Sequence, residues 1–99
     1  MPYAFVQDVP ADEQLYGEIR SRMGATPPKG LISHVAVPRE GGLRYLDVWE
    51  TAEDWERFRE EVAEPIVGEV LVAHGLPHDH SLVRFEELRP IDVWVGEPA

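Results

Sequence analysis

The chain has no cysteine among its 99 residues. This absence excludes a disulfide framework and a thiolate nucleophile or metal ligand, and it is typical of a reducing compartment. Basic residues are also scarce, because nine Lys and Arg stand against nineteen Asp and Glu, a formal charge of −10. A field of this sign repels phosphate backbones and anionic lipid surfaces, so we expect neither nucleic acid nor a membrane as a partner.

Long hydrophobic runs are missing too, since no apolar stretch approaches the ~20 residues that span a bilayer. Residues 1–5 carry no basic segment ahead of an apolar one, as a secretory leader would, and we expect a cytoplasmic protein. A hydrophobic content of 43% is enough for a core. The length predicts a single domain over residues 1–99, with its core in 3–88 and a C-terminal extension in 89–99.

The apolar patterns predict four main strands and two helical regions. The strands are expected at residues 3–9, 31–37, 43–49 and 81–88, and a short extra strand at 91–95. Asp12 and Thr51 are natural N-caps, and the helices that they begin end before Gly24 and Gly75. Pro65 is expected to kink the second helix or divide it in two.

The order β-α-β-β-α-β predicts an α+β, ferredoxin-like fold, an antiparallel sheet with the helices on one face. The other face of such a sheet needs cover, and a chain of this length has no third layer to supply it. Packing two sheets face to face in a homodimer would cover both and enclose a pocket for a small-molecule ligand.

Four segments carry a family resemblance: Gly30-Leu31-Ile32-Ser33-His34-Val35-Ala36, the Gly41-Gly42 turn, Asp47-Val48-Trp49-Glu50-Thr51 and Trp55-Glu56-Arg57-Phe58. Over residues 3–88 the chain resembles the dimeric α/β-barrel superfamily that includes the antibiotic biosynthesis monooxygenases. The resemblance implies a dimeric α/β barrel. Members include cofactor-independent oxygenases of aromatic polyketides, haem-degrading enzymes, cyclases and decarboxylases.

A two-residue turn at Gly41 and Gly42 would pair Glu40 with Leu43 and set His34 opposite Trp49. The side-chain period of two then divides the hairpin into two faces. One set is predicted to face the partner subunit: His34, Tyr45, Asp47 and Trp49. The other set is predicted to meet the helices: Ser33, Val35, Val37, Leu46 and Val48.

The first set suits general acid–base chemistry on a flat phenolic substrate. We expect His34 to transfer the proton and Asp47 to orient its ring. Four neighbours are expected to contact the substrate: Ile32, Ala36, Tyr45 and Trp49. Interface packing of the His–Trp pair is the alternative. Helical periodicity assigns Trp55 and Phe58 to the core.

Histidines and an aspartate also gather near the end of the second helix, at His74, His78, Asp79 and His80. Imidazole and carboxylate suit divalent transition ions, but the spacing matches no closed structural site, and a solvated loop is the prediction. Three glutamates are expected on a solvated helix face: Glu60, Glu61 and Glu64. The sequence therefore predicts no metal and no cofactor.

These observations predict a cofactor-independent enzyme of secondary metabolism, oxygenating or cyclising an aromatic, polyketide-like small molecule. The alternative is a non-catalytic small-molecule-binding or accessory dimeric protein. The absence of asparagine favours this alternative, because asparagine recurs in the pockets of the oxygenase branch.

Overall fold

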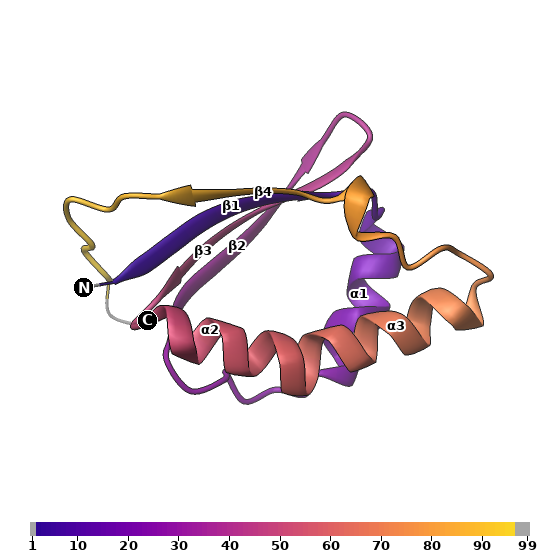
Figure 1. The fold of residues 1–99 in the computed structure, drawn as a ribbon, viewed down its shortest axis with the longest axis horizontal. Helices are drawn as coiled ribbons and strands as arrows, with labels where there is room; N and C mark the ends of the chain where they lie inside the picture. Colours follow the sequence, from indigo (N-terminus) through magenta and orange to yellow (C-terminus); the bar gives the residue numbers. More distant parts are fainter. Residues whose placement is uncertain (1, 97–99) are drawn as a thin grey trace.

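The computed structural model describes residues 2–96, and its elements follow the predicted β-α-β-β-α-β order (Figure 1). The strands are β1 (Tyr3–Val9), β2 (Leu31–Arg39), β3 (Gly42–Trp49) and β4 (Arg84–Leu88). They form one sheet in the order β2-β3-β1-β4, and each neighbouring pair is antiparallel. This topology confirms the ferredoxin-like α+β fold.

The helices begin where the capping residues predict. The Asp12 side chain accepts a hydrogen bond from the Leu15 amide at 2.7 Å and begins α1 (Glu13–Arg22). Thr51 Oγ1 accepts one from the Asp54 amide at 3.1 Å and begins α2 (Ala52–Phe58). Each cap satisfies one amide that the first helical turn leaves without a backbone partner.

The second helical region is two helices in series, as predicted. A π-helical turn, η1 (Arg59–Ala63), joins α2 to α3 (Glu64–Ala73), and the three run as one curved rod along the sheet (Figure 1). Pro65, the second residue of α3, directly follows the π-helical turn, and its missing amide interrupts the ladder of backbone hydrogen bonds at this join. A short 3-10 helix, η2 (His80–Leu82), then leads into β4.

The core lies between β1, β3 and α2. Phe5, Trp49 and Trp55 form the buried cluster, with ring centroids 4.6 Å apart for Phe5 and Trp55 and 5.6 Å for Trp49 and Trp55. Phe58 packs against this cluster, so the core assignment of both helix aromatics is confirmed. Three large aromatic side chains supply most of the apolar area that holds α2 on the sheet.

The β2–β3 hairpin has a register two residues away from the predicted one. Arg39 pairs with Gly42, so Glu40 and Gly41 make the turn, and His34 pairs with Asp47 rather than Trp49. Gly42 is the first residue of β3, and a Cβ at this position would collide with the Val9 carbonyl, so the position requires glycine. Since the offset is even, side chains predicted to share a face still share it.

The prediction of which face meets the helices is wrong. The Trp49 ring is buried against Phe58 of α2, and Tyr16 of α1 bonds to His34, so this face lies under the helices. Val35, Val37 and Leu46 are 42–48% exposed on the opposite side, which we call the open face. Alternation along a strand divides the side chains into two sets, but it does not say which set the helices cover. The set with the aromatic side chains buries more apolar area, so it lies under the helices.

Residues 89–96 contain no helix or strand, so the predicted extra strand at 91–95 is wrong. Ile91 and Trp94 are more than 90% exposed, and residues 97–99 lie outside the described part. Within residues 2–96, no helix combines the length and apolar character needed to cross a bilayer.

Candidate functional site

A chain of hydrogen-bonded side chains runs from α1 into the core of the sheet. Tyr16 Oη lies 2.8 Å from His34 Nε2, and His34 Nδ1 lies 2.6 Å from Asp47 Oδ1. Trp49 Nε1 donates to the other carboxylate oxygen, Asp47 Oδ2, at 3.0 Å. The four side chains therefore form a continuous Tyr–His–Asp–Trp relay, with Tyr16 at its outer end.

The Trp49 indole can only donate and an ionised carboxylate can only accept, and these two facts set the direction of the bonds at Asp47. Asp47 accepts from Trp49 and so offers its second oxygen to the Nδ1–H of His34. The neutral ring then has a free lone pair on Nε2, and the Tyr16 hydroxyl donates to it. His34 is thus held in the tautomer that can accept a proton from the side of Tyr16.

Sheet pairing explains why these residues meet. His34 on β2 is directly opposite Asp47 on β3, and Trp49 lies two residues further along the same strand and face. The Asp47 side chain is only 7% exposed, whereas that of His34 is 26% exposed. The buried end of the relay orients the ring, and the partly exposed end can reach a ligand.

Two tyrosines surround the imidazole. The Tyr16 ring is nearly parallel to that of His34, with an interplanar angle of 9° and centroids 6.1 Å apart, and the Tyr45 ring centroid is 5.3 Å from that of His34. Burial raises the pKa of Tyr16, although Arg20 opposes this shift. Burial, with the neighbouring Tyr16 and Asp47, raises the pKa of Tyr45 strongly. Both phenols therefore keep their protons at neutral pH.

The structure brings together most of the residues predicted for the site. His34, Tyr45, Asp47 and Trp49 share the helix-facing side, and Ala36 pairs with Tyr45. Ile32 is the exception. It is the extra residue of a β-bulge between Leu31 and Ser33 and lines the open face.

Tyr16 was not predicted as a site residue, because its place beside the apolar stripe of α1 indicates packing. The sequence contains one indication of a polar role for Tyr16: its phenol lies on the sheet-facing side of an amphipathic helix, and a buried tyrosine hydroxyl usually has a hydrogen-bond partner. Its contact with His34 joins residues 18 positions apart in the sequence, and only the packing of α1 on β2 creates it.

A row of side chains crosses the helix-facing side next to the relay. Gln7 of β1 is paired with Tyr45 on one side and with Phe85 of β4 on the other. Phe85 packs against Phe5 at 4.7 Å between ring centroids, yet it is 45% exposed. The helices therefore leave the β4 end of this row open to solvent. The Gln7 amide and the Tyr45 phenol continue the row from that end toward the relay.

The open face holds a separate hollow of about 450 Å³. Its walls come from all four strands and the C-terminal segment: Ala4, Ile32, Ser33, Leu46, Val48, Leu88, Pro90 and residues 92–96. The sheet separates this hollow from His34, so the two places are independent.

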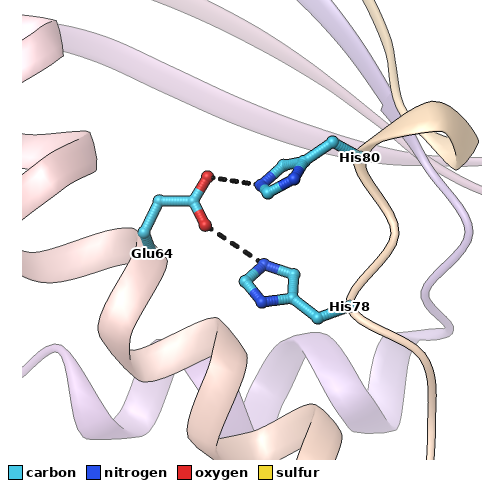
Figure 2. A group of neighbouring side chains, drawn as sticks. All are labelled: Glu64, His78 and His80. Carbon is cyan, nitrogen blue, oxygen red and sulfur yellow. Dashed lines mark hydrogen bonds and ion pairs between the residues drawn. The ribbon is translucent and has the colours of Figure 1, made fainter.

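The predicted metal-like cluster is divided by the fold. His74 bonds to Glu18 of α1 at 2.6 Å, and the Asp79 carboxylate caps η2 through Ser81, which lowers the Asp79 pKa. His78 and His80 instead converge on Glu64, at the start of α3 (Figure 2). Within the described part of the chain, these three side chains form the group whose His and carboxylate atoms lie close enough together to hold a metal ion.

The fold and this site define a small ferredoxin-like protein with a histidine relay beneath its helices. No protein-family model matches the chain, and no curated protein matches its sequence.

Three solved structures are similar to this chain in fold. A putative antibiotic biosynthesis monooxygenase from Chloroflexus aurantiacus has a TM-score of 0.59 at 14% identity, over 95% of this chain and 97% of that one. Rv0793 from Mycobacterium tuberculosis has a TM-score of 0.59 at 15% identity, over 94% and 98%. SnoaB from Streptomyces nogalater, a cofactor-independent oxygenase, has a TM-score of 0.52 at 14% identity, over 97% and 96%. These likenesses confirm the ferredoxin-like fold of the single chain.

Proposed function

We propose that the chain is a cofactor-independent enzyme that removes a proton from an aromatic, polyketide-like small molecule, leading to its oxygenation or cyclisation. The observation that carries this proposal is the unbroken relay from Tyr16 through His34 to Asp47. A partly exposed imidazole whose other nitrogen is held by a buried carboxylate is the arrangement that general acid–base catalysis requires.

The relay moves one proton by two transfers. The substrate gives a proton from a phenol, or from a carbon beside a carbonyl, to Tyr16 Oη as the Tyr16 proton passes to His34 Nε2. Burial raises the pKa of Tyr16, so the phenol carries its proton before the transfer begins. Asp47 then stabilises the imidazolium through the bond to Nδ1.

The deprotonated substrate carries the chemistry from there. Its electron-rich carbon reduces dioxygen in an oxygenation, or attacks a carbonyl of the same molecule in a cyclisation. The residues of the chain supply the base, which is His34 acting through Tyr16. They also supply the orientation of that base and the surface that binds the aromatic rings of the substrate.

The row formed by Tyr45, Gln7 and Phe85 is the binding surface in this proposal. Side chains on neighbouring strands are ~5 Å apart, so three in a row match a flat molecule of two or three fused rings. Aromatic faces at both ends support stacking, and the Gln7 amide can bond a substrate carbonyl.

We also propose that the open face packs against a second copy of the chain. Exposed apolar side chains gather along β2, β3, β4 and the C-terminal segment: Val35, Val37, Leu46, Leu88, Ile91, Trp94 and Val95. A contiguous apolar surface of this kind marks an interface. Replacing Leu46 by Asp should convert a dimer to a monomer in sedimentation experiments, and a monomeric wild-type chain would contradict the proposal.

The hollow on the open face favours a second candidate, a non-catalytic ligand-binding or accessory protein. A volume of about 450 Å³ falls in the range of small-molecule sites, and its apolar walls do not include His34. A ligand held there would bind without touching the relay.

Incubation with anthrone and quinol substrates in air distinguishes the two candidates. The enzyme proposal expects oxygen uptake or product formation that falls in His34→Gln and Tyr16→Phe but not in His74→Gln, whose histidine contacts Glu18 of α1 outside the relay. Equal turnover in all four proteins would remove the relay from the mechanism. The second candidate expects that the protein binds these molecules without turnover, and that Ser33→Trp blocks the binding because its side chain would fill the hollow.

A further inference from the structure

Glu64, His78 and His80 come together from separate parts of the chain (Figure 2). Glu64 is the first residue of α3, His78 lies in the loop after that helix, and His80 begins η2. Each imidazole meets a different oxygen of the one carboxylate, at 3.1 Å for His78 Nε2 and 2.8 Å for His80 Nε2. The three ligand atoms all lie within 4.8 Å of one another.

From this convergence, we propose that Glu64, His78 and His80 form a binding site for a divalent transition-metal ion. Two imidazole nitrogens and one carboxylate oxygen are ligands of borderline character, which suit Zn²⁺, Co²⁺ and Ni²⁺. Three protein ligands leave at least one position for water, so the site is an open one. It is separate from the relay and does not depend on the proposed activity.

The separations are close to those of a metal site. Ligand atoms bound at ~2.0–2.2 Å to a tetrahedral ion are roughly 3.5 Å apart. The two His–Glu64 distances, 3.1 and 2.8 Å, would lengthen slightly, and atoms up to 4.8 Å apart would approach by about 1.3 Å at most. The His80 side chain is 71% exposed and has room to rotate. Glu64 and His78 are about 30% exposed, which gives an ion access from solvent.

Helix α3 leaves space for the His78 ring at Gly68. Gly68 lies one turn after Glu64 on the same side of the helix, and a Cβ there would come within 3.3 Å of His78 Nδ1. A glycine in the middle of a helix costs ~1 kcal/mol relative to alanine, and here the space it leaves is taken by the imidazole. The ring is therefore held over the carboxylate by packing as well as by its hydrogen bond.

The neighbouring acid does not compete for this role. Asp79 Oδ1 already accepts from the Ser81 amide at 2.9 Å and from the Ser81 hydroxyl at 2.7 Å. This cap turns the backbone so that the histidines on either side of Asp79 point toward Glu64 (Figure 2). The net charge of −10 further favours binding of a cation.

The test is a titration of chelator-treated, full-length protein with ZnCl₂, followed by calorimetry, and with CoCl₂, followed by visible absorption. We expect one ion per chain with a Kd below about 0.1 mM, and a rise in the melting temperature because the ion binds the folded state. His78→Ala and His80→Ala should weaken binding by more than the ~10- to 100-fold typical of a lost outer-shell partner.

His74→Ala is the matched control, because it removes an exposed histidine at the end of α3 that bonds to Glu18 of α1 instead of Glu64. It should bind zinc as the wild type does. Gly68→Ala should fold normally but bind zinc more weakly, since the new methyl group displaces the His78 ring. Absence of saturable binding, or binding that survives His78→Ala and disappears in His74→Ala, would overturn the proposal.

Discussion

The relay around Asp47 and the group around Glu64 both pair histidine with a carboxylate, and they differ in almost every other respect. In the first, Asp47 is 7% exposed and both its oxygens accept bonds, from one imidazole and one indole. In the second, Glu64 is 30% exposed and faces two imidazoles from one loop. The same residue types therefore make an oriented proton relay in one place and a group of ligand atoms in the other.

The surroundings account for the difference. The first cluster lies on paired strands under a helix, where a buried carboxylate is compensated by donors that the sheet holds in place. The second joins a helix start to a loop, where solvent screens the charges and the side chains can rearrange. Side chains held in fixed positions suit the transfer of a proton from one to the next. Side chains that can rotate suit binding of an ion, because they can move to contact it.

The two clusters should differ most when the negative charge of the carboxylate is removed by substitution with the matching amide. Asp47→Asn should lower turnover by about 10²-fold or more, because its amide would donate to His34 Nδ1 and reverse the tautomer. It should also lower the free energy of unfolding by about 1–3 kcal/mol, since a buried bonding network is disrupted. Urea denaturation and steady-state kinetics measure both effects; an unchanged turnover would contradict the relay.

Tyr16→Phe should separate catalysis from stability within the first cluster. Loss of the hydroxyl removes the outer end of the relay, so kcat should fall by about 10²-fold, while the lost bond costs only ~1 kcal/mol of folding free energy. Kinetics beside thermal melting would show the split. A loss of stability as large as that of Asp47→Asn would indicate that Tyr16 is mainly structural.

The three tyrosines should respond to alkali later than free tyrosine. The pKa of Tyr3 is raised to about 12 by burial and by its bond to Glu87, and the pKa values of Tyr16 and Tyr45 are also raised. An unfolded chain loses these protons near pH 10 while the folded chain keeps them, so the free energy of unfolding should fall as pH rises from about 10 to 12. Ultraviolet titration of tyrosinate, native against urea-unfolded, measures this shift; coincident curves would refute it.

The smallest effect is expected at the second cluster. Glu64→Gln should change the stability of metal-free protein by less than about 1 kcal/mol, because its partners are exposed and solvent-screened. Measured beside Asp47→Asn, it compares the same chemical change in two settings. A cost at Glu64 equal to that at Asp47 would show that exposure does not separate the clusters.

Local sequence by itself determined the order of elements and the grouping of side chains. The caps at Asp12 and Thr51 act within one turn, and alternation along β2 and β3 depends only on strand geometry. His34, Tyr45 and Asp47 were therefore correctly placed on one face, even though the turn register was wrong by two residues.

Tertiary structure alone decided which face the helices cover and which distant side chains meet. Alternation is symmetric between the two sides of a sheet, so only competition for burial placed Trp49 under α2 and left Val35 exposed. The contacts of Tyr16 with His34, and of Glu64 with His78 and His80, depend on how α1, α3 and the loop pack. Such contacts join residues 14 or more positions apart, beyond the reach of local pattern, because helix packing rather than residue spacing brings them within bonding distance.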